Sequence, residues 1–441
     1  MSDPSQLNDS KNVPLDDGHE YLVMNDLGDR VTFQRFRPRP KSPVSDTRGY
    51  QSEKSVKEIA LEWGFPENVY SRAVISKGSA TREVGDLLLV SGKRAVVLQV
   101  KSRNAENDDL EKIKRWVKRE VGKAAGQGKG SIRSMEQSDQ VFENGRGTKL
   151  SLQGSKLEIG VLVVLDIPAV PEQLVVEVNP DSKTLVITLT EFEFLFGQLK
   201  SVSAVIRYVF RVSSMDPVEL GTEIQRFMSH AMADNDVSLA KHAMNLPNGA
   251  YRLSTPVLPL EPVGIRDEEA HLFFRQVCEI IGAFATETGA DPVALSTIFG
   301  GIDDLPVQSG EMLGRFILDG LGFFQSQEDG HGQFNWKFRF IFQEELGLRY
   351  VFGVSKKFDT QRTNEMFVSR LQITHHQFQR DSTNFEGKLT IGVLVTPRNT
   401  WPGFDVGVMV IDDRQQLSEE DFESLVSFWN QLRPPSASPL P

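Results

Sequence analysis

The sequence predicts an α/β protein in which a mixed sheet is flanked by helices, followed by a second, α+β domain. The chain has 441 residues, which is enough for two or three domains. Its hydrophobic share of 39% and charged share of 25% are those of ordinary globular proteins. Short apolar, β-branched runs alternate with helical stripes from about residue 52 to 212 and again from 263 to 433. Strands that alternate with helices in this way favour a mixed sheet.

The charge balance and the single cysteine exclude several classes of protein. The 49 Lys and Arg residues against 60 Asp and Glu residues give a net charge of −11, so nucleic-acid binding would need a local basic patch. Cys278 is the one cysteine, which excludes an intramolecular disulfide and a thiolate zinc cluster. The chain has no eighteen-residue apolar run and its first residues are polar. We therefore expect no membrane span, no signal peptide and a cytoplasmic location.

Proline-rich and polar stretches divide the chain into predicted parts. We expect residues 1–50 to be an irregular arm, because their prolines can neither continue a helix nor donate to a ladder. Residues 434–441 contain four prolines and are expected to be a disordered tail. Between these ends we expect an α/β domain at 51–212, a helical connector at 213–262 and an α+β domain of unknown role at 263–433.

The elements of the two domains follow from periodicity and capping signals. The first domain is expected to contain helices at 53–63, 110–125, 192–199 and 204–211 and strands at 84–90, 95–100, 159–165, 174–178 and 184–187. Thr190 with Glu193 predicts a capping box that opens the third helix. Farther on we expect helices at 219–232 and 268–284, an aromatic-faced strand at 334–342 and a final helix opened by Ser418. Core packing is the favoured explanation of that aromatic face, and a base-stacking platform is the alternative.

Two strands of the first domain form a hairpin that brings three polar side chains together. A two-residue loop with Gly92 in first place predicts a type II′ turn. The register that this turn sets places Asp86 directly opposite Gln99, and Lys101 follows two residues later on the same face. Because an unpaired buried charge is costly, a divalent cation would explain these polar residues inside apolar strands. The side-chain oxygens of Asp86 and Gln99 suit Mg²⁺ or Mn²⁺, and Lys101 could orient a water or stabilise charge on a phosphate.

At these residues the chain resembles the PD-(D/E)XK nuclease superfamily, in the Mrr-like variant with a QxK motif. Asp86, twelve further residues and then Gln99-x-Lys101 reproduce that motif. The resemblance covers roughly residues 50–212 and includes the order of a helix, the hairpin and a second helix. It implies a restriction-endonuclease-like fold and Mg²⁺-dependent or Mn²⁺-dependent hydrolysis of phosphodiester bonds. It also implies that Asp86, Gln99 and Glu53 on the first helix hold the metal, and that these three and Lys101 are the catalytic residues.

Two departures from the family pattern leave a second interpretation open. Gly85 precedes Asp86 where the family often has a proline. Gln99 replaces an acid, which removes one negative charge and should weaken metal binding. The alternative is therefore a catalytically inactive nuclease-fold module that binds nucleic acid or a protein. Asp86 and Lys101, which are more often lost when such a domain becomes inactive, are both present.

A basic stretch follows the hairpin. Residues 110–133 carry eight Lys or Arg residues and two acids, a local balance of +6. Three glycines, Gly126, Gly128 and Gly130, are expected to form an open, flexible backbone that could approach phosphates. A phosphate-contacting surface and a solvated helix face are the two interpretations. In the first, the nucleic-acid-binding residues are Lys112, Arg115, Lys118, Arg119, Lys123, Gln127 and Lys129.

Two segments of the first domain have similar counterparts in the second. The segment 156–163 matches 388–395 at seven of eight positions, and 94–101 weakly resembles 349–356. A diverged duplication would give both similarities, and convergence of strand composition is the alternative.

In a duplicate aligned on these matches, Ile341 would stand in the place of Asp86 and Val354 in that of Gln99. The second domain would then have lost the chemistry. The expected substrate is DNA, in defence against foreign DNA or in repair, although nothing in the chain distinguishes DNA from RNA. Cutting of both DNA strands would favour a homodimer. Residues 263–433 are the expected binding region of a regulatory protein.

Overall fold

The structure is a computed structural model of the chain. It describes residues 11–14, 21–26, 31–36, 48–77, 80–103, 109–137, 141–151, 157–167, 169–178, 183–217, 219–243, 258–260, 262, 264–287, 292–326, 336–343, 347–356, 360–381, 388–398, 403–412 and 417–431. The tail expected at 434–441 lies outside these residues.

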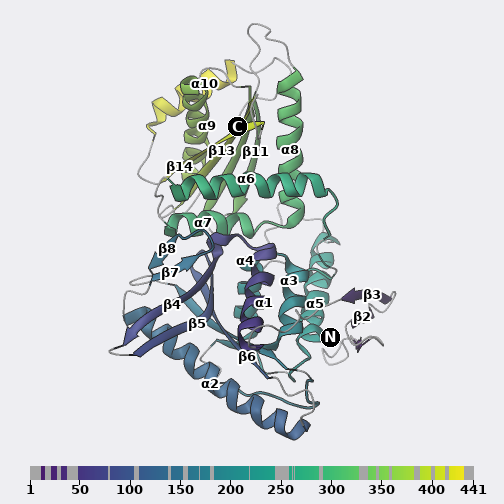
Figure 1. The fold of residues 1–441 in the computed structure, drawn as a ribbon. Helices are drawn as coiled ribbons and strands as arrows, with labels where there is room; N and C mark the ends of the chain where they lie inside the picture. The colour runs from purple at the N-terminus through teal and green to yellow at the C-terminus, as the bar shows by residue number, and fades with distance from the viewer. Residues whose placement is uncertain are drawn as a thin grey trace. The chain divides into compact units, whose positions relative to one another are not determined.

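Helices and strands alternate along most of the chain (Figure 1). The helices are α1 (Arg48–Trp63), η2 (Pro66–Asn68), α2 (Leu110–Gln137), α3 (Leu189–Leu199), α4 (Val202–Val212), α5 (Glu223–Ala243), α6 (Glu268–Glu287), α7 (Pro292–Asp303), α8 (Val307–Ser326), α9 (Thr360–Arg380) and α10 (Glu419–Gln431). The strands are β1 (Lys11–Pro14), β2 (Tyr21–Asp26), β3 (Val31–Phe36), β4 (Val69–Lys77), β5 (Ala80–Ser91), β6 (Arg94–Ser102), β7 (Val141–Asn144), β8 (Lys149–Ser151), β9 (Glu158–Asp166), β10 (Thr184–Thr188), β11 (Trp336–Gln343), β12 (Leu348–Ser355), β13 (Leu389–Pro397) and β14 (Phe404–Ile411).

The chain forms two compact units. The first contains Met1–Gly264 and Asp291–Asp304, and the second contains Ile265–Ala290 and Leu305–Pro441. The expected boundary at 263 lies beside the observed one, but α7 belongs to the first unit although its sequence falls inside the expected second domain. It is anchored there because Asp303 Oδ2 accepts a hydrogen bond from the Ser203 backbone N–H over 2.6 Å.

The first unit is built on a seven-stranded mixed sheet. The strand order is β10-β9-β6-β5-β4-β7-β8. β6, β9 and β10 are parallel neighbours, and the remaining pairs are antiparallel. The expected mixed sheet flanked by helices is therefore confirmed. β4, β7 and β8 extend it on a side where the sequence analysis placed no strand.

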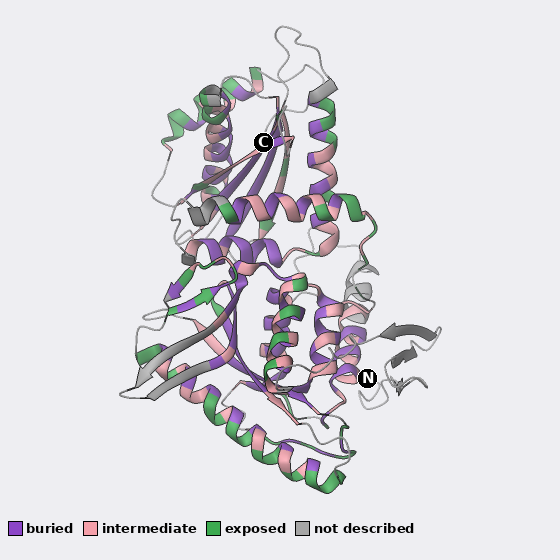
Figure 2. Cartoon of the chain, in the orientation of Figure 1, coloured by how far each residue is buried: buried purple, intermediate pink, exposed green. Residues whose placement is uncertain are grey.

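Helices cover both faces of this sheet. α2 covers one face, where Val117 and Val121 share a hydrophobic core with Val163 of β9. α1, α3 and α4 cover the other face, where Val56 of α1 shares a core with Leu98 of β6. The central strands are consequently buried from both sides (Figure 2). This double burial explains why they appear in the sequence as continuous apolar runs.

Two expectations for the first unit were wrong. The described residues before α1 are not irregular, because β1, β2 and β3 form an antiparallel three-stranded sheet. The prolines used to predict the arm follow β3, and the segments before them are rich in β-formers such as Tyr21 and Val31. No strand forms at 174–178, where Val175 makes an isolated bridge to Glu219.

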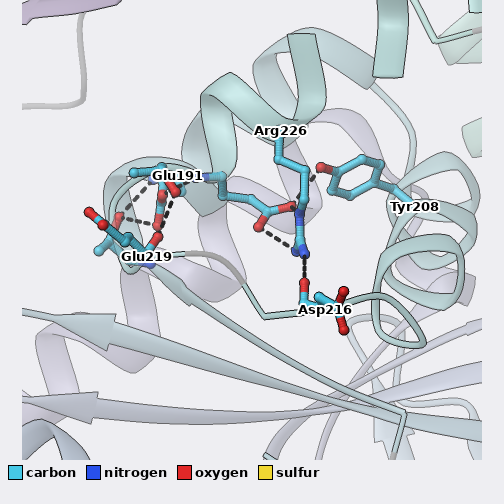
Figure 3. A network of polar contacts seen from close by, with 8 residues as sticks. Glu191, Tyr208, Asp216, Glu219 and Arg226 are labelled. Carbon is cyan, nitrogen blue, oxygen red and sulfur yellow. Dashed lines mark hydrogen bonds and ion pairs between the residues drawn. The ribbon is translucent and has the colours of Figure 1, made fainter. Parts of the chain in front are cut away.

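The capping box of α3 lies two residues before the predicted one. Thr188, not Thr190, is the N-cap, and its hydroxyl accepts a hydrogen bond from the Glu191 backbone N–H. The Glu191 carboxylate accepts in return from the Thr188 N–H over 2.7 Å, and also from the N–H of Glu223 at the start of α5 over 2.7 Å. Glu223 in turn accepts from the Tyr208 hydroxyl and pairs with Arg226 (Figure 3). This buried polar network joins the N-termini of α3 and α5.

The second unit contains a four-stranded sheet in the order β11-β12-β13-β14. β12 and β13 are parallel, and the outer pairs are antiparallel. α9 covers one face, and an added Cβ at Gly392 would overlap the side chain of Leu371 of that helix. The aromatic side chains of β11 pack against this core, as expected, with the Phe338 and Phe367 rings nearly parallel. Ser418 caps the final helix α10, also as expected.

The two sheets share a local topology, but the sequence match is one residue out of step with their hydrogen bonds. In each, an antiparallel hairpin leads through a helix to a strand parallel to the second hairpin strand. The N–H of Glu158 binds the carbonyl of Lys93, and that of Leu389 binds the carbonyl of Gly347. Glu158 and Leu389 are therefore equivalent, whereas the sequence match aligns Glu158 with Thr390. A one-residue slip turns every side chain to the other face of a strand, so the matched side chains point to opposite faces of their two sheets.

This one-residue shift also changes which residues of the second unit correspond to Asp86 and Gln99. Phe338 and Gly353 pair across β11 and β12. In the structural alignment they take the places of Asp86 and Gln99, which the sequence match gave to Ile341 and Val354.

Candidate functional site

The β5–β6 hairpin has the register predicted from its turn. Ser91 pairs with Arg94 and Leu87 with Leu98. Gly92 has φ 57°, a value that glycine adopts without the steric cost of a Cβ atom. The hairpin therefore carries Asp86 toward Gln99, as the sequence indicates.

A β-bulge at Gly85 and Asp86 ends the regular pairing of β5. On β4, Ser71 pairs with Leu87 and Ala73 with Val84, so two residues of β5 oppose one residue of β4. Gly85 has φ 68°, and an added Cβ there would lie only 2.7 Å from Val97 Cγ1. Gly85 thus meets both the backbone and the space requirement for glycine. A proline could not take the place of Gly85, because proline fixes φ near −65°.

The bulge gives the Asp86 carboxylate a place in the sheet. The register would pair Val100 with Gly85, but the Val100 N–H instead donates to Asp86 Oδ2 over 2.6 Å. A charge-assisted hydrogen bond thereby replaces one bond of the ladder. The side chain of Asp86 is half-buried, so it is held rigidly yet remains accessible.

Gln99 and Lys101 lie on the face of the sheet that α2 covers. Val97, two residues before Gln99, belongs to the core that includes Met135 of α2. Alternate residues of a strand share a face, which places Gln99 and Lys101 on that side. Gln99 is only 4% exposed, and Lys101 is half-buried. The structure therefore brings a carboxylate, a carboxamide and an ammonium to one region of the hairpin.

The chemistry of these groups fits a hard divalent cation. Asp86 and Gln99 offer side-chain oxygens, and the Val100 carbonyl points to the same side of β6 as the Val100 N–H that binds Asp86. Across the described part of the chain, no three His, Cys, Asp or Glu side chains are grouped to hold a metal. A cation at the hairpin would therefore depend on carboxamide, backbone and water oxygens as well as on carboxylate oxygens.

Glu53 lies on a different side of the sheet from Gln99 and Lys101. It is half-buried in the first turns of α1, the helix that covers the opposite face. The preceding residue, Ser52, donates a hydrogen bond to Asp166 Oδ2 over 2.6 Å. Glu53 is thus near the ends of β6 and β9, where it would reach the hairpin residues only around the strand ends.

Asp166 is a residue that the sequence analysis missed. It ends β9 beside Ser102 of β6 and is only 8% exposed. A charged carboxylate is costly to bury, so the burial of this one needs an explanation. The signal available in the sequence was an acid directly after the apolar run 159–165. An acid at the end of a buried strand is equally typical of a turn, so the sequence did not distinguish it.

The basic stretch is a continuous helix, which corrects the expectation of an open glycine backbone. α2 runs to Gln137 and includes Gly126, Gly128 and Gly130. Gly128 is buried, and an added Cβ would lie 2.6 Å from Val161 Cγ1 of β9. Glycine serves here for close helix–sheet packing and not for contact with phosphates.

The predicted nucleic-acid-binding residues are mostly on the solvent side of α2. Lys123 and Arg119 are exposed, but both pair with Glu120, at 3.0 and 2.8 Å. Burial by itself would raise the pKa of the Glu120 carboxyl. Hydrogen bonds from Lys123 and Arg119 outweigh this effect, so the pKa of Glu120 lies below its usual value. The other exposed members are Lys112, Arg115, Lys118 and Gln127, and Lys129 is half-buried.

The comparisons with known proteins identify no relative. The chain matches no protein-family model, no curated protein and no solved structure. No helix in the described ranges is long and apolar enough to cross a membrane.

Proposed function

We propose that the first unit is a metal-dependent nuclease that hydrolyses phosphodiester bonds of DNA. The observation that carries this proposal is the bulge at Gly85, which holds the Asp86 carboxylate beside the backbone of Val100. A hairpin needs no such device for packing alone. Placing a half-buried carboxylate next to Gln99 and Lys101 is useful for holding a cation and a phosphate. The fold we propose for this unit is restriction-endonuclease-like.

Each residue of the hairpin has a role in this proposal. Asp86 and Gln99 would hold Mg²⁺ or Mn²⁺, the Val100 carbonyl would be a further oxygen donor, and Glu53 would assist from α1 around the strand ends. A bound divalent ion supplies Lewis-acid stabilisation of the phosphate and a more acidic water. Lys101 stabilises the negative charge that develops on the phosphate oxygens or orients the attacking water. Cations of α2 hold the flanking phosphates.

Incubation of the purified protein with circular plasmid tests this proposal. Mg²⁺, Mn²⁺ and EDTA are compared for the wild type, Asp86→Ala and Lys101→Ala. Lys93→Ala is the matched control, because Lys93 is an exposed lysine at the turn of the same hairpin. We expect metal-dependent nicking by the wild type and by Lys93→Ala only. Undiminished nicking by both Asp86→Ala and Lys101→Ala would overturn the proposal.

A nucleic-acid-binding module without cleavage is the second candidate. It is favoured by one observation: within the described ranges, no three His, Cys, Asp or Glu side chains are grouped to hold a metal. Such a module would shift DNA on a gel in EDTA, with strong salt dependence and no dependence on Mg²⁺. Binding in EDTA together with no nicking in either metal would support it over the nuclease.

A further inference from the structure

A buried hydrogen bond fixes the first turn of α1 to the end of the central sheet. Ser52 Oγ donates to Asp166 Oδ2 over 2.6 Å, between residues 114 positions apart in the chain. Ser52 is 2% exposed and Asp166 is 8% exposed. A buried carboxylate is costly unless it is hydrogen-bonded, so this pair fixes the position of the helix.

The same place joins the ends of β6 and β9 to α1. Ser102 of β6 pairs with Asp166 of β9. The Arg103 N–H donates to the Asp166 backbone carbonyl over 3.0 Å, so the chain leaving β6 is also held by Asp166. On the helix side, a Cβ added to Gly49 would lie 3.7 Å from Ser102 Oγ. The side chain and the backbone of Asp166 therefore hold two different elements together.

This junction adjoins both groups of proposed site residues. Glu53 follows Ser52 directly in α1, and Lys101 precedes Ser102 directly in β6. Ser52 cannot shift without moving Glu53, because both belong to the same helical turn. The hydrogen bond between Ser52 and Asp166 consequently sets where Glu53 lies relative to the end of β6.

We propose that Asp166 is a positioning residue. It acts through Ser52 to hold Glu53 where the proposed nuclease site would bind its metal. This inference rests on the proposed function. Asp166 touches neither the metal nor the substrate in this scheme. Partners of this kind, one step away from a metal ligand, are commonly worth about ten-fold to a hundred-fold in metal affinity.

The test compares Ser52→Ala, Asp166→Ala, Asp166→Asn, Glu53→Gln and the double variant Ser52→Ala/Glu53→Gln. Three quantities are measured: the Mn²⁺ dissociation constant by calorimetry without DNA, the Mg²⁺ concentration for half-maximal plasmid nicking, and Tm. We expect Ser52→Ala and Asp166→Ala to raise both metal constants about ten-fold. Asp166→Asn should change them much less, because its amide oxygen still accepts from Ser52. Ser52→Ala should add little to Glu53→Gln.

The outcomes separate this inference from the proposed function. If Ser52→Ala and Asp166→Ala lower Tm but leave both metal constants unchanged, the pair only supports the fold and the inference is overturned. Additive effects of Ser52→Ala and Glu53→Gln would also overturn it, because the pair would then not act through Glu53. A wild type that neither binds Mn²⁺ nor nicks plasmid would overturn the proposed function and this inference with it. Ser52→Ala carries the test if Asp166→Ala does not fold.

Discussion

The carboxylate of Asp86 accepts a hydrogen bond from the backbone N–H of Val100 over 2.6 Å. This bond replaces the ladder bond that Gly85 would make if β5 continued without its bulge. Asp86 is therefore part of the sheet as well as the central residue of the proposed site. Loss of activity in an alanine variant alone would not separate these two roles.

Asp86→Asn and Asp86→Ala together separate them. The asparagine amide oxygen still accepts from Val100, so we expect Tm close to that of the wild type. Alanine leaves the N–H without this acceptor and should cost about 1–2 kcal/mol of unfolding free energy. Metal-dependent nicking should be lost in both, because both remove the charge. Thermal unfolding and plasmid nicking check this, and a fully active Asp86→Asn variant would contradict a metal-holding role.

The hairpin was predictable because its signals are local. A turn with Gly92 and the two apolar runs beside it determine the register of β5 and β6 without any information from elsewhere in the chain. The bulge was not predictable, because it depends on β4 as well as β6. The bond between Ser52 and Asp166 joins residues 114 positions apart, and a single sequence carries no signal for such a pair.

The glycines of α2 give a matched pair of variants. Gly128→Ala would place a Cβ 2.6 Å from Val161 Cγ1, whereas Gly126 has no atom within 4 Å of its added Cβ. We expect Gly128→Ala to destabilise the protein by about 1–3 kcal/mol through overpacking. Gly126→Ala should stabilise it by about 0.5–1 kcal/mol through higher helix propensity. Chemical denaturation measures both, and equal effects would show that Gly128 does not pack closely on β9.

The sequence analysis ended α2 too early, at residue 125, because of the glycines that follow. Three glycines within five residues lower helix propensity, so residue 125 was a reasonable stop. Tertiary packing overrides this, since Val117, Val121 and Met135 are all buried along one stripe of the helix. The sequence match between the two sheets shows a related weakness. Buried strands draw on few residue types, so short identities occur without structural equivalence.

The cations of α2 should differ in their contribution to DNA binding. Arg119 and Lys123 already pair with Glu120, whereas Arg115 and Lys118 are exposed on the same helix and make no ion pair within the described ranges. We expect Arg115→Gln/Lys118→Gln to reduce the slope of log affinity against log salt by about two. Arg119→Gln/Lys123→Gln, the matched control, should reduce it less. Gel-shift titrations at several salt concentrations measure the slopes. A larger reduction of the slope in the control would contradict the expectation that Arg115 and Lys118 contact the DNA.

Glu191 should make the stability of the first unit depend on pH. Its carboxyl lies in the buried network of Figure 3, and burial raises its pKa from 4.5 to about 7 against hydrogen bonds from Thr188 and Glu223. The folded protein thus holds this proton more tightly than the unfolded chain. The stabilising contribution is complete below about pH 4.5 and is lost as pH rises through 7, a loss of about 3 kcal/mol at most.

Glu191→Gln tests this dependence, because glutamine keeps the shape and one acceptor oxygen but has no proton to lose. We expect the unfolding free energy of the wild type to fall between pH 5 and 8 and that of Glu191→Gln to fall much less. Glu58→Gln, an exposed position on α1, should follow the wild type. Urea unfolding at four pH values in this range measures the three slopes. If Glu191→Gln keeps the wild-type slope, the helix N-termini and their donated hydrogen bonds hold Glu191 ionised despite its burial.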